Sequence, residues 1–361
     1  MSVPSPIGLL AELTHRCPLG CPYCSNPLEL VRSSGELDTA AWTRVMQEAA
    51  DLGIMHVHLS GGEPLTRNDL AEIVNAANVA GLYTNLITSA IGLTPQRLSE
   101  LKGVGLDHVQ ISIQGVDPAR ADTVAHLKGA MKAKREAAQR VVQEALALTV
   151  NAVIHRDNIH DLPQIIELAQ EWGAGRLEVA HVQYHGWALV NRASLMPSRK
   201  DFETAARLVE EARARLSGEL VIDHVIPDYY GDRPKACMGG WGRQVIVVTP
   251  DGRALPCHAA ASLPGLTFAN VKNKSLAEIW QADAAFEKFR GTAWMPKPCQ
   301  GCERAEVDWG GCRCQAFALA GDAAATDPVC ALSPDHAKVA AAIAKDAAAP
   351  HAPYRFRRIG G

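Results

Sequence analysis

The chain has 361 residues, of which 47% are hydrophobic and 21% are charged, the proportions of an ordinary globular protein with about two domains. Its 36 basic and 39 acidic side chains give a formal net charge of −3, which argues against a large surface for nucleic acid or an anionic membrane. No basic segment followed by an apolar run opens the chain, and no stretch of about 18 apolar residues occurs in it. We therefore expect a cytoplasmic protein.

The first half of the chain has the pattern of an α/β fold. Residues 7 to about 185 read as strands alternating with helices, which predicts a parallel sheet wound by right-handed crossovers. Whether the sheet closes into a barrel is left open by the pattern. We expect strands at 7–13, 55–60, 83–88, 108–113, 148–154 and 176–182, and helices at 38–52, 69–80, after Thr94-Pro95, and at 132–146 and 161–172.

Unusual residues follow the predicted strands, where α/β folds place their chemistry. After the first strand comes Cys17-Pro18-Leu19-Gly20-Cys21-Pro22-Tyr23-Cys24, and after the second comes Gly61-Gly62-Glu63-Pro64. The later strands end near polar residues that could each be a turn residue or a satisfied core group. These are Asn85, Thr88, Ser89, Ser112, Gln114, Asn151, His155, Gln183, Tyr184 and His185.

The cysteine spacing C-x3-C-x2-C is the strongest single signal. Three thiolates on a short loop with Pro and Gly can turn toward one centre, as an iron-sulfur cubane requires. A [4Fe-4S] cluster held by Cys17, Cys21 and Cys24 leaves one iron without a protein ligand, and an open position lets a metal site meet a substrate. On spacing alone, a zinc knuckle, disulfides or core cysteines are alternatives.

The second half of the chain is organised differently. Residues 191–236 are predicted to form a bridge, with a helix at 201–216 followed by a segment with several prolines. Residues 237–335 are rich in Gly and Cys and poor in long periodic elements, as expected where metals replace much of a hydrophobic core. An Ala-rich helix and a tail complete the chain at 336–361. The expected units are thus 7–190, 191–236, 237–335 and 336–361.

The ten cysteines fall into two groups, with none between Cys24 and Cys237 and seven from Cys237 to Cys330. In a reducing compartment such cysteines are metal ligands more often than disulfide partners.

Taken together, the cysteine motif, Tyr23 before its third cysteine, and Gly61-Gly62-Glu63-Pro64 resemble the radical S-adenosylmethionine (SAM) superfamily. The resemblance implies a partial (β/α)6 barrel in which the amino and carboxylate groups of SAM fill the open iron position. The residue types suit a ligand-binding turn, because glycines permit a close backbone approach and Pro64 stiffens the turn. By this resemblance the SAM contacts are Tyr23, Gly61, Gly62, Glu63, Pro64, Ser112 and Asn151.

The later cysteines resemble the SPASM auxiliary-cluster domain, a small cysteine-rich iron-sulfur unit. This chain departs from the family pattern by carrying Asp308 where a cysteine is usual, and by having an extra Cys314. Seven cysteines plus Asp308 supply eight donors, enough for two auxiliary clusters of [4Fe-4S] or [2Fe-2S] type. Asp308 could instead be a solvated acid, or a zinc ribbon could use Cys299, Cys302, Cys312 and Cys314. We assign Cys237, Cys257, Cys312 and Cys314 to an inner set, and Cys299, Cys302, Asp308 and Cys330 to an outer set.

Four segments, residues 21–28, 151–156, 183–188 and 309–314, resemble the peptide cyclase family of pyrroloquinoline quinone (PQQ) biosynthesis. This implies a precursor peptide, PqqA, as substrate, a small chaperone, PqqD, and an electron donor such as flavodoxin or ferredoxin. It also implies a carbon-carbon bond between the γ-carbon of a Glu and the ring of a Tyr. Another SPASM peptide- or protein-modifying enzyme, such as a sulfatase-maturating one, and a zinc-stabilised binding scaffold are the alternatives.

Overall fold

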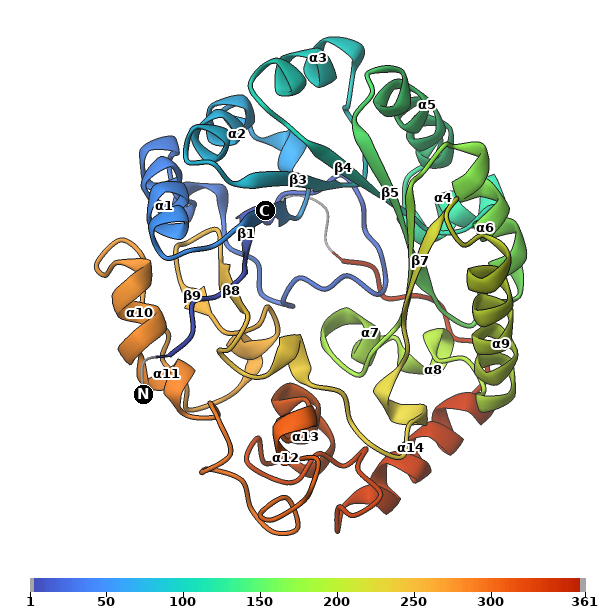
Figure 1. Cartoon of the computed structure of the whole chain (residues 1–361). Helices are drawn as coiled ribbons and strands as arrows, with labels where there is room; N and C mark the ends of the chain where they lie inside the picture. The colour runs from blue at the N-terminus through green and yellow to red at the C-terminus, as the bar shows by residue number, and fades with distance from the viewer. Residues whose placement is uncertain (1–2, 358–361) are drawn as a thin grey trace.

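One nine-stranded β-sheet organises the computed structural model, which describes residues 3–357 (Figure 1). The strand order is β7-β6-β5-β4-β3-β2-β1-β8-β9, and every neighbouring pair is parallel except β8 and β9. The last residues of the expected tail, 358–361, lie outside the described part. Figure 1 shows the strands arranged as an open ring with helices outside it; β7 and β9 are its two ends and do not pair with each other.

The six strands expected from the sequence are present, each within about a residue of its predicted bounds. Alternating parallel strands and helices confirm the predicted α/β class. The strands are β1 (Gly8–Thr14), β2 (His56–Gly61), β3 (Tyr83–Thr88), β4 (His108–Ile113), β5 (Ala147–Ile154) and β6 (Arg176–His181).

The helices begin where the sequence places capping residues. The side chain of Asp38 accepts a hydrogen bond from the backbone of Ala41, and that of Thr94 accepts one from Arg97. The helices outside the sheet are α1 (Thr39–Asp51), α2 (Leu70–Val79), α3 (Pro95–Gly103), α4 (Pro118–Ala125), α5 (Ala130–Gln143), α6 (Leu162–Glu171) and α9 (Arg199–Arg215). Shorter helices and the last helix are α7 (Gly186–Val190), α8 (Arg192–Leu195), α10 (Leu276–Ala282), α11 (Ala284–Glu287), α12 (Ala305–Asp308), α13 (Arg313–Ala320) and α14 (His336–Ala348).

The main hydrophobic core lies between the strands and these helices. Along β2, Val57 and Leu59 are fully buried in it, while His56 and His58 alternate with them and are half-buried on the other face. Burying an aliphatic side chain of this size contributes about 1.5–3 kcal/mol. The alternation therefore leaves polar side chains facing the inside of the ring.

Three strands come from the segments expected to be a bridge and a metal-organised unit. β7 (Val221–Val225) pairs with β6, and β8 (Val245–Val248) pairs with β1 and with the short β9 (Ala254–Leu255). The second half of the chain is thus joined to the first through the same sheet. In residues 3–357, no helix combines the length and apolar character that crossing a membrane requires.

Candidate active site at the cysteine loop

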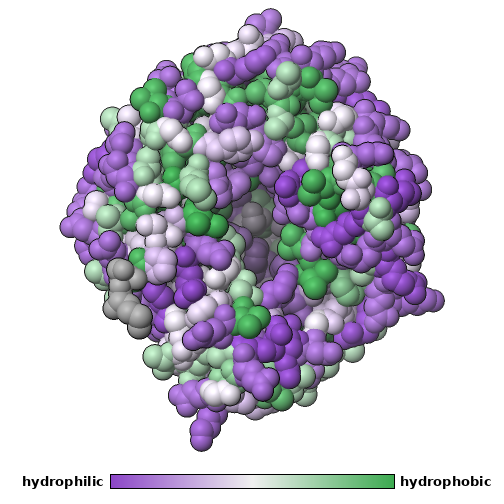
Figure 2. All heavy atoms as spheres, viewed as in Figure 1, coloured by the Kyte–Doolittle hydropathy of each residue, from purple (hydrophilic) through white to green (hydrophobic). Residues whose placement is uncertain are grey.

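The first three cysteines lie on the loop that follows β1, which Figure 1 shows crossing the middle of the ring of strands. The surface is hollowed at the centre of the same face (Figure 2). Cys17 and Cys24 are both close enough to Cys21 for their charges to interact. Burial raises the pKa of the Cys17 thiol to about 11 and that of Cys21 to about 12. A bound cation is what would favour the thiolate forms here, so the donor set fits an iron cluster.

Polar atoms without partners surround these thiols. The Cys24 thiol donates to Asn26 Oδ1 at 3.3 Å, and Gln114 Nε2 donates to the Cys21 sulfur at 3.9 Å. The other amide atoms, Asn26 Nδ2 and Gln114 Oε1, are buried with no partner in residues 3–357, as are Tyr23 Oη and His155 Nε2. An unsatisfied buried polar group costs about 1–3 kcal/mol. The surroundings of the loop therefore fit a polar ligand beside the cluster.

The glycine turn after β2 packs directly on the chain entering the cysteine loop. The Gly62 nitrogen donates to the Thr14 carbonyl at 2.5 Å, and the Glu63 nitrogen donates to the Arg16 carbonyl at 2.7 Å. A Cβ on Gly61, whose φ is +124°, would lie 2.3 Å from the Thr14 oxygen, and one on Gly62 would lie 2.2 Å from the Arg16 oxygen. Glycine is required at both positions because this backbone approach leaves no room for a side chain.

The carboxylate of Glu63 is bound entirely by the protein. It is fully buried and accepts from Thr88 Oγ1 at 2.7 Å, from the backbone of Ser89 at 2.7 Å and of Leu65 at 3.1 Å, and from Ser89 Oγ. Burial raises the pKa of Glu63, and these hydrogen bonds oppose the rise. Glu63 thus ties the turn, which continues through Pro64, to the end of β3.

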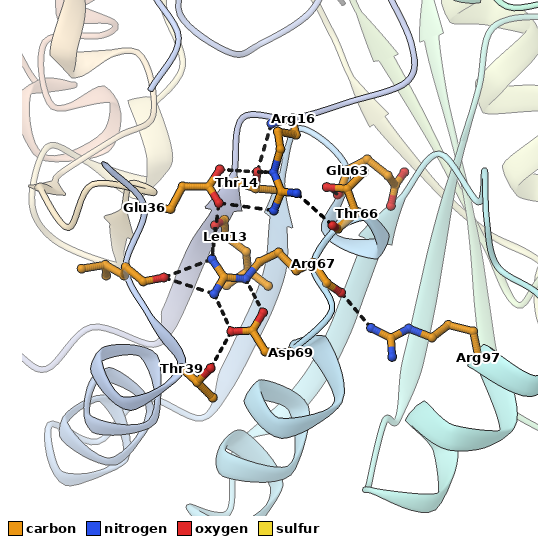
Figure 3. A network of polar contacts seen from close by, with 11 residues as sticks. Leu13, Thr14, Arg16, Glu36, Thr39, Glu63, Thr66, Arg67, Asp69 and Arg97 are labelled. Carbon is orange, nitrogen blue, oxygen red and sulfur yellow. Dashed lines mark hydrogen bonds and ion pairs between the residues drawn. The ribbon is translucent and has the colours of Figure 1, made fainter. Parts of the chain in front are cut away.

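A second network supports the same turn from below (Figure 3). Arg67 is 6% exposed and donates to the carbonyls of Leu13 and Leu37 at 3.0–3.1 Å. It also pairs with Asp69 at 2.6 Å and lies 3.7 Å from Glu36. The network fixes the end of β1 just before the cysteines.

Lys134 is a buried cation of this site that the sequence analysis missed. It is 1% exposed, and its Nζ donates to the carbonyls of Ser89 and Ser112 at 2.8 Å each. Burial lowers its pKa to about 8, and the nearby Cys21 and Glu63 oppose that change. Its position on the apolar face of α5, between Met131 and the buried Ala138, is the signal that could have identified it.

The other predicted SAM contacts lie on or next to strands of the same sheet. Ser112 and Asn151 are register partners on β4 and β5, and Asn151 Nδ2 donates to Glu178 at 2.8 Å. The ring of Tyr23 packs on that of His155 with centroids 5.5 Å apart. The turn Gly61–Pro64, Ser112 and Asn151 are thus all on or just after strands of the ring, while their contact with SAM stays a prediction.

The four thiols of the inner auxiliary set are neighbours in the structure, while their binding of a cluster stays a prediction. The thiol of Cys237 faces those of Cys257 and Cys312, and Cys314 faces the same two. Hydrogen bonds within the set raise the pKa of Cys237 and Cys314 and lower that of Cys257 and Cys312. Four thiols that face one another in this way fit a fully ligated cluster.

The outer set lines one cavity. Its walls include Cys299, Cys302, Asp308 and Cys330 together with Thr326 and Asp327. Asp308 is 8% exposed and accepts from the Gly310 backbone at 3.0 Å, so it is not a solvated surface acid. Its coordination of iron stays a prediction.

The zinc ribbon considered from the sequence does not form. The structure separates its four cysteines, because Cys312 and Cys314 face Cys237 and Cys257 while Cys299 and Cys302 line the outer cavity. Within residues 3–357, no group of three or more His, Cys, Asp or Glu side chains has the arrangement of a single-ion site.

Two histidines connect the barrel to the inner set. His185 follows β6, and its Nε2 lies 3.3 Å from Nε2 of His258, the residue after Cys257. Tyr184, by contrast, is 2% exposed and donates to Asp346 at 2.8 Å, so its hydroxyl is engaged in packing α14.

Comparisons with known families agree with this geometry. The profile of the radical SAM superfamily matches residues 11–169, and that of the SPASM iron-sulfur cluster-binding domain matches residues 237–303. Two solved structures share the fold. Streptococcus suis SuiB bound to S-adenosylmethionine has a TM-score of 0.73 at 18% identity, covering 87% of this chain and 74% of that one. The structure of anSMEcpe with bound AdoMet has a TM-score of 0.66 at 14% identity, covering 95% and 97%.

The fold and the cysteine sites therefore define a radical SAM enzyme with a SPASM iron-sulfur domain. Curated relatives give the particular family. A protein of Methylobacterium sp. (strain 4-46) named PqqA peptide cyclase is 59% identical over 361 residues, 100% of this chain and 95% of the relative. One of Methylorubrum extorquens (strain PA1) with the same name is 58% identical over 99% of this chain and 93% of its own. The chain belongs to the PqqA peptide cyclase family.

Proposed function

We propose that this enzyme joins the γ-carbon of a Glu to the ring of a Tyr within the precursor peptide PqqA, as a step of PQQ biosynthesis. The observation that carries the proposal is identity of 56–59% over nearly the whole chain to proteins named PqqA peptide cyclase. The placement of the radical SAM and auxiliary cysteines supports it. All ten cysteines are free thiols, which suits work in a reducing cytoplasm.

Different residues of the site would bind the cluster and the polar groups beside it. Cys17, Cys21 and Cys24 would hold the [4Fe-4S] cluster, and the orphan atoms of Asn26 and Gln114 are placed to bind polar groups beside it. When bound, the cluster and SAM would supply the radical chemistry that removes a hydrogen atom from the peptide, and the auxiliary clusters would supply one-electron redox capacity. On one side of the site, the packed glycine turn and the buried side chains of Glu63 and Lys134 exclude water.

Two auxiliary clusters follow from the two donor sets. Cys237, Cys257, Cys312 and Cys314 would hold the inner cluster. Cys299, Cys302, Asp308 and Cys330 would hold the outer one, with a carboxylate oxygen in place of a thiolate. Ligand identity is one of the levers that set the potential of an iron-sulfur cluster, so the two clusters are expected to differ in potential.

The test is anaerobic incubation of iron-loaded enzyme with PqqA, PqqD, SAM and reduced flavodoxin. The expected product has lost two hydrogens, and fragmentation maps the loss to one Glu and one Tyr. Peptides with that Glu changed to Gln or that Tyr changed to Phe are the matched controls. Formation of 5′-deoxyadenosine with an unchanged peptide would contradict the proposal and favour another SPASM substrate. Omitting PqqD, and replacing flavodoxin by ferredoxin, tests each partner separately.

A further inference from the structure

The C-terminal strap, defined as residues 350–357, returns from α14 to the cysteine loop. Figure 1 shows this red segment running from α14 into the ring of strands. Arg156 holds its start by donating to the carbonyl of Ala349 at 3.0 Å, and the hydroxyl of Tyr354 donates to Asp157. The ring of Phe356 stacks on His126 with centroids 4.2 Å apart. The strap is therefore fixed along its length.

Asn191 links the strap to the cysteine loop. Its Oδ1 accepts from the Arg355 backbone at 2.7 Å. Its Nδ2 donates to the Arg355 carbonyl at 2.9 Å and to the Pro22 carbonyl, inside the cysteine motif, at 2.8 Å. One amide thus joins two segments that are more than 300 residues apart in sequence.

Arg357 reaches furthest into the site. It is 2% exposed, its backbone nitrogen donates to the Gly20 carbonyl at 3.2 Å, and its guanidinium donates to the His15 carbonyl. Its Nε is buried with no partner, and it makes no ion pair with any Asp or Glu of residues 3–357. Burial raises the pKa of the Cys17 and Cys24 thiols, and the charge of Arg357 opposes that rise.

A buried guanidinium without a carboxylate partner needs another negative charge nearby, because desolvating an uncompensated ion is costly. Arg357 is close enough to Cys17 and Cys24 for its charge to act on both thiols. We propose that Arg357 is a positioning residue of the radical-generating site, which anchors the cysteine loop at His15 and Gly20 and offsets the negative charge of the iron-bound thiolates. This inference rests on the class of enzyme and is independent of which peptide is modified.

The charge of Arg357 has a measurable consequence. A cation beside a cluster favours its reduced form, so a neutral residue makes the midpoint potential more negative. Loss of a hydrogen bond from a buried charged group also loosens the loop. We expect 5′-deoxyadenosine formation without peptide to fall by about tenfold or more, because the cluster is harder to reduce and its loop is held less firmly.

The experiment uses the full-length, iron-loaded enzyme with Arg357→Ala, Arg357→Gln and Arg357→Lys. Arg355→Ala is the matched control, since Arg355 lies in the same strap with an exposed side chain. The readouts are iron content, the midpoint potential of the cluster whose electron paramagnetic resonance spectrum changes on adding SAM, and 5′-deoxyadenosine formation without peptide.

Arg357→Ala and Arg357→Gln should give a more negative potential and slower SAM cleavage. Arg357→Lys should restore the potential, and Arg355→Ala should match the unchanged protein. Gln keeps a side-chain N–H donor, so it separates charge from anchoring if the Ala variant does not fold. The inference would be overturned if Arg357→Gln had the same midpoint potential as Arg355→Ala. It would also be overturned if Arg357→Lys failed to restore the potential. Because no peptide is present, this outcome is distinguishable from failure of the proposed cyclase function.

Discussion

The cysteine loop and the auxiliary region hold their thiols in opposite ways. Cys17, Cys21 and Cys24 come from eight consecutive residues, and distant parts of the chain hold that short segment in place. These parts include the glycine turn, Glu63, Lys134 and the C-terminal strap. In the auxiliary region the proposed ligands themselves come from distant segments, spread from Cys237 to Cys330.

This difference indicates where each region obtains its order. The loop is fixed by hydrogen bonds from a barrel with a large hydrophobic core, so its shape should survive loss of iron. Around the auxiliary thiols the structure has short helices, α12 and α13, and a smaller apolar cluster that includes Trp241 and Phe289. There the metal should contribute to folding as well as to chemistry.

The largest expected effect separates the two regions by function. Cys17→Ala should abolish 5′-deoxyadenosine formation, by about a thousandfold or more, because the SAM-binding cluster loses a ligand. The barrel should keep its hydrogen-exchange protection. Cys237→Ala should leave SAM cleavage measurable while the segment around α12 and α13, residues 299–330, loses protection; β8 and β9 belong to the barrel sheet and should keep theirs. If Cys17→Ala and Cys237→Ala lost hydrogen-exchange protection equally, the two regions would not differ in their dependence on metal.

The next prediction concerns the network of Figure 3. Arg67→Ala leaves Asp69 and Glu36 without their buried partner and should lower the free energy of unfolding by about 3–5 kcal/mol. Urea titration with a barrel tryptophan signal measures it. Lys132→Ala is the control, because its side chain is 84% exposed and 4.0 Å from Glu136, and should change stability by less than about 0.5 kcal/mol. If Arg67→Ala lowered the free energy of unfolding as little as Lys132→Ala does, Arg67 would not stabilise the end of β1.

A smaller effect is expected from pH. Burial lowers the pKa of His181 to about 3 and that of its neighbour His224 to about 4. Unfolded histidine has a pKa of about 6.5, so the unfolded chain binds these protons first and stability falls as pH drops from about 6.5 toward 4. His181→Gln should remove about 1–2 kcal/mol of the difference in unfolding free energy between pH 7 and pH 5. An unchanged slope would show that His181 does not contribute.

The smallest expected effect concerns iron release from the outer set. Asp308→Asn should speed release of iron from that cluster to a chelator by about tenfold, if a carboxylate ligand is weakened. SAM cleavage without peptide should be unchanged. Glu306→Gln, an exposed acid on the same short helix, is the control. Identical iron release in the two variants would remove Asp308 from the ligand set.

The sequence predicts these regions to different extents for the same physical reason. Apolar alternation and capping residues act locally, so the six barrel strands and most helices were placed within a few residues. The short strands β7, β8 and β9 differ from the prediction, which places no strand there; β8 depends on β1, which lies more than 200 residues earlier in the chain. Lys134 and Arg357 also act through tertiary position. A lysine on an apolar helix face leaves a faint pattern, whereas Arg357 lies in a tail with no periodic signal.

The pairing of β8 with β1 has a consequence for how substrate enters. β1 lies between β2 and β8, with Gly8 opposite both His56 and Val245, and leads directly into the cysteine motif. A hinge that swung the auxiliary region away would have to break this ladder. The enzyme should therefore admit its peptide by moving loops at the rim, while the spacing between its redox centres stays constant through the catalytic cycle.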